Sequence, residues 1–190
     1  MTAASASIKK ADVHAALLRG VNVGGANKLA MSDLRAIFES AGCLQVQTII
    51  QSGNVVFCAE DKVAKGLGDA ITKQVEKRFG LKVPVVLRSA AELEAVIGAN
   101  LYLNAGAAEE MLHVSFLADR PSADLVAGLD AARSAPDEFA VVGRDIYMKL
   151  VTGAAKTKLT NAYFDSKLKT VSTMRNWRTV LKLAEMTRDA

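Results

Sequence analysis

The chain has 190 residues, of which 51% are hydrophobic and 23% charged, and its net charge is +4. These proportions are typical of soluble globular proteins and exclude disorder, a collagen-like repeat or a coiled coil as a description of the whole chain. A chain of this length buries roughly 70% of its unfolded surface, so it needs neither a disulfide nor a metal for stability. No apolar run approaches the ~20 residues of a membrane helix, and the first twelve residues lack a signal peptide. We therefore expect a cytoplasmic protein with no membrane partner.

The cysteine and histidine content points to no metal centre or cofactor. Only Cys43 and Cys58 occur, and their spacing matches no metal or redox motif. Two cysteines in a chain without a leader are best interpreted as reduced thiols. The two histidines, His14 and His113, form no pair with nearby carboxylates or cysteines that would bind a metal.

The first half of the chain predicts six elements in the order β-α-β-β-α-β. Ser32 and Asp61 are candidate helix N-caps, and Ser52-Gly53 is a tight-turn signal between two strands. Pro84 favours an edge position for the last strand. The expected elements are strands at 13–18, 44–50, 54–58 and 83–87, a helix from Ser32 to Gly42, and one continuous helix from Asp61 to Gly80.

The second half repeats the order β-α-β-β with changes. Ser89-Ala90-Ala91-Glu92 forms a capping box, which predicts that a helix begins there. The further expected elements are a strand at 112–117, a helix at 122–133, a hairpin of 138–142 with 146–150, and a helical C-terminus whose buried stripe includes Trp177, Val180, Leu181 and Ala184.

This order predicts an α+β protein made of two tandem ferredoxin-like halves with antiparallel sheets. We expect a disordered tail at 1–12, a first half at 13–88, and a second half with C-terminal helices at 89–190.

Several motifs resemble those of a bacterial family of unknown function, DUF1697. The resemblance begins at Arg19–Gly25 and Gln51–Phe57 and continues through Glu138–Arg144, Lys158–Asn161 and Thr173–Lys182. It implies two ferredoxin-like halves and no particular activity. The chain departs from the family pattern at Asn100-Leu101-Tyr102 and at Ala155-Lys156-Thr157. Lysine at the second site cannot offer the bidentate fork of an arginine.

The glycine-rich segment from Gly20 to Lys28 is the first candidate binding site. Glycines allow backbone N–H groups to line a concave nest, and Arg19 and Lys28 add positive charge, which suits a phosphate or a carboxylate. The segment is not a Walker loop, because Ala26 stands where that motif needs lysine. The alternative is a tight loop whose glycines only permit positive φ.

Sheet topology extends this candidate site. In a ferredoxin-like sheet the end of the first strand and the hairpin at Gln51–Asn54 lie at one edge. We therefore expect one polar ligand site there, with Arg144 at the corresponding edge of the second half. The alternative is that Gln51–Asn54 are ordinary hairpin residues that bind no ligand. The predicted residues are Arg19, Asn22, Gly24, Gly25, Lys28, Gln51, Ser52 and Asn54, with a second set of Arg144, Lys158, Asn161 and Arg175.

Charge is distributed unevenly along the chain. Residues 1–90 carry +5, residues 91–140 carry −7 and residues 141–190 carry +6. Arg175, Arg178 and Lys182 are expected on one helical face, where they could follow a phosphate backbone or simply be solvated. Sequence-specific RNA recognition is not expected, because the 54–58 strand supplies only one aromatic, Phe57.

Three classes of function stay open at the level of sequence. The favoured class is a protein that binds an anionic small ligand or a nucleic-acid backbone. The first alternative is a metal-independent enzyme acting on a small anionic substrate, with acid–base chemistry at His14 or His113. The second is a structural or self-assembling protein that exposes a sheet edge or an apolar patch. The oligomeric state is not specified by the sequence.

Overall fold

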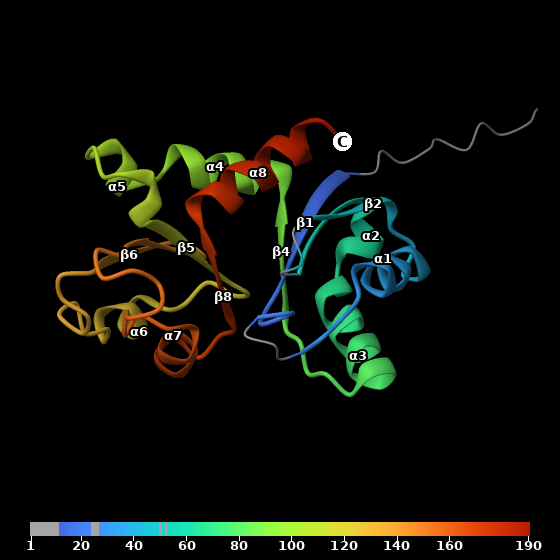
Figure 1. The fold of residues 1–190 in the computed structure, drawn as a ribbon, viewed down its shortest axis with the longest axis horizontal. Helices are drawn as coiled ribbons and strands as arrows, with labels where there is room; N and C mark the ends of the chain where they lie inside the picture. The colour runs from blue at the N-terminus through green and yellow to red at the C-terminus, as the bar shows by residue number, and fades with distance from the viewer. Residues whose placement is uncertain (1–11, 24–26, 50, 52) are drawn as a thin grey trace, which may run out of the picture.

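The computed structural model describes residues 12–23, 27–49, 51 and 53–190. It consists of two lobes, each built on a four-stranded antiparallel sheet, with two helices between them (Figure 1). The expected tail lies outside the described residues except for Asp12, which begins the first strand. No helix in the described ranges is long and apolar enough to cross a membrane.

The N-terminal lobe contains β1 (Asp12–Leu18), β2 (Leu44–Ile49), β3 (Asn54–Ala59) and β4 (Val85–Ser89) in the spatial order β2-β3-β1-β4. This is the ferredoxin-like order, with β4 at an edge as Pro84 predicts. Two helices, α1 (Met31–Ser40) and α3 (Leu67–Phe79), cover its outer face (Figure 1).

The C-terminal lobe has the same topology. Its strands are β5 (Leu112–Leu117), β6 (Glu138–Val142), β7 (Asp145–Lys149) and β8 (Ser172–Asn176), in the order β6-β7-β5-β8. The outer face is covered by α6 (Ala123–Ala127) and α7 (Asn161–Leu168). The α+β fold with two ferredoxin-like sheets is therefore confirmed.

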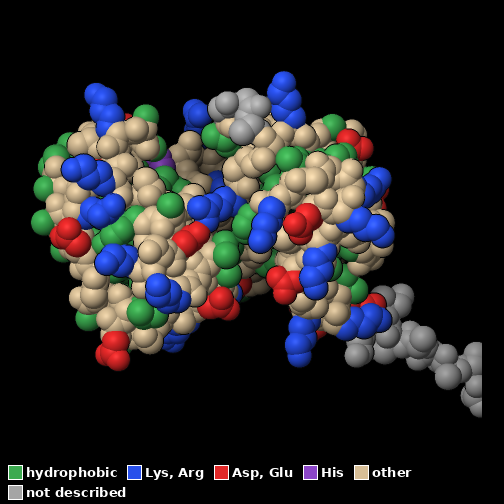
Figure 2. Space-filling model, turned by 90° about the horizontal axis from the view of Figure 1, so that it is seen from below, with side chains coloured by type: hydrophobic (Ala, Val, Ile, Leu, Met, Phe, Trp, Pro, Cys, Tyr) green, Lys and Arg blue, Asp and Glu red, His purple; other side chains and the backbone are tan. Residues whose placement is uncertain are grey.

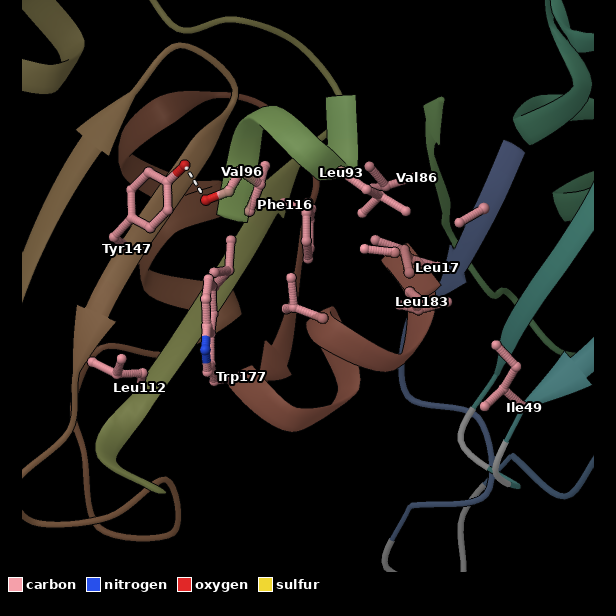
Figure 3. Packing of buried hydrophobic residues seen from close by; sticks show 14 of the residues in the cluster. Leu17, Ile49, Val86, Leu93, Val96, Leu112, Phe116, Tyr147, Trp177 and Leu183 are labelled. Atoms are coloured by element: carbon pink, nitrogen blue, oxygen red, sulfur yellow. Dashed lines mark hydrogen bonds between the residues drawn. The ribbon is translucent and has the colours of Figure 1, made fainter. Parts of the chain in front are cut away.

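The inner faces of the two sheets bury a shared core between the lobes. It also includes α4 (Ala90–Gly98) and α8 (Trp177–Arg188), which pack against each other (Figure 3). Along β1, Ala15 and Leu17 face this core, whereas Ala16 and Leu18 face the helices of the N-terminal lobe. Burial on both faces explains why the strand is a continuous apolar run rather than an alternating one. The short α5 (Leu101–Asn104) and the 3-10 turn η1 (Glu109–Met111) connect α4 to β5.

Three predicted helices differ from those observed. The helix expected from Asp61 is split into α2 (Asp61–Ala64) and α3, because Gly66 takes a left-handed φ of 78° between them. Ala30, not Ser32, is the N-cap of α1. The helix expected at 122–133 ends at Ala127, before Gly128. The capping box at Ser89 is confirmed.

The sequence predicts a helical C-terminus but not the strand that precedes the last helix. Residues 172–176 form β8, which pairs with β5, and α8 begins only at Trp177. Arg175 therefore lies in a strand and does not share a helical face with Arg178 and Lys182. The run Ser-Thr-Met-Arg-Asn gives no apolar strand signal, since both of its ends are polar.

One arginine from the edge strand of each lobe is bonded to the hairpin of the other lobe. Arg88 of β4 is buried and donates from Nη2 to the carbonyls of Leu117 and Arg144 at 3.0 and 2.7 Å and to Asp145 Oδ1 at 2.9 Å. These acceptors lie where β5 meets the β6–β7 hairpin. The C-terminal lobe is thereby tied to the edge of the N-terminal sheet.

Arg175 of β8 makes the equivalent contacts in the opposite direction. Its Nη2 donates to the carbonyls of Leu18 and Gly53 at 2.8 and 3.4 Å, and its Nε donates to Asn54 Oδ1 at 2.6 Å. Gly53 has a φ of 71°, and a Cβ there would stand 2.9 Å from the Leu18 Cβ, so only glycine fits the turn. The two arginines thus occupy equivalent positions in the two lobes.

A buried carboxylate links two loops of the C-terminal lobe. Asp137 accepts hydrogen bonds from Thr152 N at 2.8 Å, Thr152 Oγ1 at 2.7 Å and Ser134 Oγ at 2.9 Å. Burial raises the pKa of Asp137, but the hydrogen bonds from Thr152, Thr157 and Ser134 outweigh burial, and the pKa is lowered below its usual value. The stabilisation that the Asp137 carboxylate contributes is therefore fully present above the pKa it has in the unfolded chain. It is lost as the pH falls through the lower pKa it has in the folded protein.

Replacing Asp137 by Asn should therefore reduce stability in a pH-dependent way. We expect Asp137→Asn to lose about 1–2 kcal/mol of unfolding free energy at pH 7, because hydrogen bonds to a charged acceptor are weakened. The deficit should shrink as the pH falls below about 4, because the unfolded carboxyl then takes up a proton that the folded wild-type carboxyl takes up only at a lower pH. Urea unfolding at pH 7 and pH 3 checks this, and a deficit of equal size at both values would contradict it.

Candidate functional site

A hollow of about 380 Å³ lies between the lobes, at the end of β1. Seen from below the view of Figure 1, Lys and Arg side chains lie on both lobes and beside the line where they meet (Figure 2). We call this hollow the inter-lobe cleft. Its lining residues come from the segment after β1, the start of α7, β8 and the first turn of α8: Arg19, Gly20, Val23, Asn161, Thr173, Met174, Arg175, Asn176 and Thr179.

Arg19 is held in place by both lobes. Its backbone N–H donates to the Pro84 carbonyl at 3.0 Å, beside β4. Its guanidinium forms an ion pair with Asp165 of α7, in the C-terminal lobe. The Arg19 side chain is 27% exposed, so it is oriented by this pair and still accessible to a ligand.

Arg175 supplies a positive charge that no carboxylate neutralises among its hydrogen-bond partners in the described ranges. Its Nη1 donates to Thr173 Oγ1 at 2.7 Å and to the Met174 carbonyl at 2.8 Å. With the contacts from Nε and Nη2 given above, each guanidinium nitrogen has a neutral partner. Burial lowers the pKa of Arg175 to about 10, so the group is still a cation at neutral pH.

Two amides add neutral donors. Asn161 Oδ1 accepts from Ser115 Oγ and Ser172 Oγ, both at 3.3 Å. Asn176 Oδ1 accepts from Thr179 N at 2.9 Å and caps α8. Because each amide uses its oxygen internally, its NH₂ group is the part left to donate to a ligand.

The corresponding end of the other hairpin is occupied by an ion pair. There Arg144, which is equivalent in position to Gly53, forms an ion pair with Glu92. Glu92 is the third residue of α4, and the equivalent third residue of α8 is Thr179. Gly53 and Thr179 cannot form such a pair. The two equivalent positions therefore differ: polar residues line a hollow beside Gly53, whereas an ion pair stands beside the β6–β7 hairpin.

The glycine-rich segment contributes to two hollows, since Gly20 and Val23 line the inter-lobe cleft while other residues of the segment face away from it. Asn22, Lys28 and Gln51 line a second one of about 550 Å³ beside the start of α1. The Asn22 side chain also fixes the loop, since its Nδ2 donates to the carbonyls of Leu29 and Gln51 at 2.9 and 2.7 Å. Among the described members of the first predicted set, only Arg19 lines the inter-lobe cleft.

The remaining predicted residues fall in several places. Gly24, Gly25 and Ser52 lie outside the described residues. Asn54 is buried and contacts Arg175. Lys158 does not line the cleft; its backbone N–H donates to Ser134 Oγ at 2.9 Å.

The histidines lie away from the cleft lining. His14 is at the other end of β1 from Arg19, stacked on Phe57 with the ring centroids 5.6 Å apart. Burial lowers the pKa of His14 against the opposing influence of Asp12, Asp61 and Glu92, and burial also lowers that of His113. Acid–base chemistry by either histidine in the cleft is not supported by this arrangement.

The thiols and carboxylates suggest no further chemistry. Burial raises the pKa of Cys43 to about 11 and raises that of Cys58, so both are protonated at neutral pH. In the part of the chain that the structure describes, no three His, Cys, Asp or Glu side chains are grouped to hold a metal ion.

Sequence reasoning missed Asp165, Thr173, Asn176 and Thr179 at the cleft. The signal that could have found them is a repeated pattern: each buried arginine immediately precedes a helix N-cap, in Arg88-Ser89 and in Arg175-Asn176. Aligning the halves on this pattern would have placed β8 beside the hairpin at Gly53.

The fold and cleft define a class of protein in which two ferredoxin-like units are joined through their inner faces, with a polar hollow where the lobes meet. The chain belongs to the family described as protein of unknown function, DUF1697, whose model matches residues 12–147. This confirms the resemblance drawn from the motifs.

A solved structure shares this fold. It is the structure of the conserved bacterial protein SP0830 from Streptococcus pneumoniae, which matches with a TM-score of 0.68 at 23% identity, over 93% of this chain and 99% of that one. At this identity the likeness shows the fold alone. No curated protein matches the chain.

Proposed function

We propose that the protein binds a small molecule carrying a phosphate or carboxylate group in the inter-lobe cleft. The observation that carries this proposal is the presence of two guanidinium groups, Arg19 and Arg175, on one hollow, with Asp165 as their one carboxylate partner among the described residues. The local charge of these three groups is +1, which favours an anion. The volume is in the range of small-molecule sites.

Each polar group has a distinct role in this proposal. Arg19 is the direct charged donor, because its side chain is accessible and a planar guanidinium matches the two oxygens of a carboxylate or phosphate. Asn161 and Asn176 add neutral donors that orient the ligand. Arg175 provides a fixed positive potential, since its own N–H groups are already bonded.

A small ligand is favoured over a nucleic-acid backbone by where Arg175 lies. A backbone site needs basic side chains arranged along one surface. Arg175 bonds to the hairpin of the other lobe, whereas Arg178 and Lys182 are on α8 and exposed. The three basic residues therefore do not form one strip.

Substitution of Arg19 tests the proposal. We expect the wild-type protein to bind inorganic phosphate, pyrophosphate or citrate in calorimetric titration at low ionic strength, and Arg19→Ala to weaken that binding about tenfold or more. Arg35→Ala, which removes an exposed arginine of α1, is the matched control and should leave binding unchanged.

Two outcomes would contradict the proposal. One is the absence of binding by all three anions. The other is equal affinity in Arg19→Ala and the wild type while circular dichroism shows both folded. A single-stranded oligonucleotide titrated in parallel would favour backbone recognition if its binding survived Arg19→Ala and fell steeply with salt.

A further inference from the structure

Asp165 contacts both lobes beside the cleft, because its two carboxylate oxygens have different partners. Its Oδ1 accepts from Ser172 N at 2.8 Å and Ser172 Oγ at 2.6 Å, within the C-terminal lobe. Its Oδ2 pairs with Arg19, which belongs to the other lobe. The two oxygens thus have separate tasks: one fixes the carboxylate to its own lobe, and the other holds the arginine.

This division makes Arg19, rather than Asp165, the partner that moves. The carboxylate is retained by two hydrogen bonds when its contact with Arg19 is lost. Arg19 has a long side chain that is a quarter exposed, and rotation about its side-chain bonds can transfer the guanidinium to another anion. The lobes stay joined meanwhile, because Arg175 keeps its bonds to Leu18 and Asn54.

We propose that Asp165 is a built-in competitor for the cleft, whose carboxylate holds Arg19 until an incoming phosphate or carboxylate group replaces it. This inference rests on the proposed function and adds its regulation. The affinity for an anion is lower than the donors alone would give, since each binding event breaks an existing ion pair. The negative charge of Asp165 also repels the anion directly.

The isosteric variant Asp165→Asn separates these effects from folding. Its amide oxygen can still accept from Ser172, while the charge that holds Arg19 is removed. We expect Asp165→Asn to bind inorganic phosphate about fivefold more tightly than the wild type, measured by calorimetry in the same low-salt buffer. The double variant Asp165→Asn/Arg19→Ala should lose this gain, because the released guanidinium is what the phosphate binds.

A matched control is provided by the ion pair between Arg144 and Glu92 at the other hairpin. Glu92→Gln removes the charge that pairs with Arg144 and keeps the capping box, because glutamine serves at that position too. It should leave phosphate affinity unchanged. A gain of the same size in Glu92→Gln would overturn the inference, since it would reflect net charge alone.

The outcomes distinguish the inference from the proposed function. If the wild type and Asp165→Asn bind phosphate equally and Arg19→Ala abolishes binding, the competitor role is wrong and the binding site stands. If neither the wild type nor Asp165→Asn binds phosphate, pyrophosphate or citrate, the proposed function itself is wrong, and the inference with it.

Discussion

Replacing Arg88 by methionine should lower the unfolding free energy by about 3–5 kcal/mol, because it leaves the carboxylate of Asp145, whose side chain is only 17% exposed, without its partner. Asp145 is held by Arg88 Nε and Nη2 at 3.3 and 2.9 Å, and the Arg88 side chain is only 1% exposed. The substitution also leaves the carbonyls of Leu117 and Arg144 without this donor. For a chain of this size, thermal unfolding should shift down by about 10 °C.

The Arg88→Met deficit should also depend on pH. Burial raises the pKa of Asp145 and Arg88 opposes this, so removal of Arg88 raises that pKa further. A group whose folded pKa is raised destabilises the fold as the pH rises through that value. We therefore expect the difference between Arg88→Met and the wild type to be smaller near the ordinary carboxyl pKa of about 4 than at pH 7.

Two controls test whether the buried charge is the cause. Arg35→Met removes an exposed arginine and should change stability by less than about 0.5 kcal/mol. The double variant Arg88→Met/Asp145→Leu removes both charges and should recover part of the loss. Equal stability of Arg88→Met and the wild type, or a double variant less stable than the sum of its parts, would contradict the explanation.

The sequence predicts most of the fold because its strands are apolar runs bounded by turn residues. β1, β3 and β5 are largely buried on both faces, and each is composed mainly of apolar residues. The Gly53 turn and the Ser89 capping box are local signals, since each depends on only a few neighbouring residues. Such features can be recognised in one chain without knowledge of the tertiary structure.

β8 could not be recognised in the same way, because its stability comes from tertiary contacts. Ser172 bonds to Asp165, Arg175 bonds to the opposite lobe, and Asn176 caps the next helix. In the sequence, this run of polar residues has the pattern of a solvent-exposed segment. The hydrogen-bond partners of Arg175 lie up to 157 positions away along the chain, and a local sequence pattern contains no information about such partners.

The residues of the candidate site differ in the same way in how far the sequence predicts them. Arg19 could be predicted as a site residue, because it directly follows a predicted strand and the topology determines at which edge of the sheet that strand ends. Asn161 lies in one of the family motifs, and Arg175 stands out as a basic residue of the C-terminal segment, but that they share a hollow with Arg19 depends on how the lobes pack. The asymmetry between Gly53 and Arg144 is informative only after the two hairpins are superimposed by their contacts with the buried arginines.

The second large effect is expected at Trp177, the largest fully buried side chain of the core between the lobes (Figure 3). Trp177→Ala should lose about 3–5 kcal/mol of unfolding free energy, because the cavity would lie between two sheets and two helices that cannot all move inward. Urea unfolding measures this loss. The partly buried Leu181 on the same helix is the matched position, and Leu181→Ala should cost clearly less.

Trp177→Phe then distinguishes packing from hydrogen bonding. The indole Nε1 is buried and has no hydrogen-bond partner among the described residues, so phenylalanine removes ring volume without leaving an acceptor unpaired. We expect Trp177→Phe to cost about 1–2 kcal/mol, well below Trp177→Ala. Since Asn176 lines the cleft and Trp177 anchors the same turn, Trp177→Phe should retain phosphate affinity. If Trp177→Phe is as unstable as Trp177→Ala, the indole N–H has an essential partner and the packing explanation is wrong.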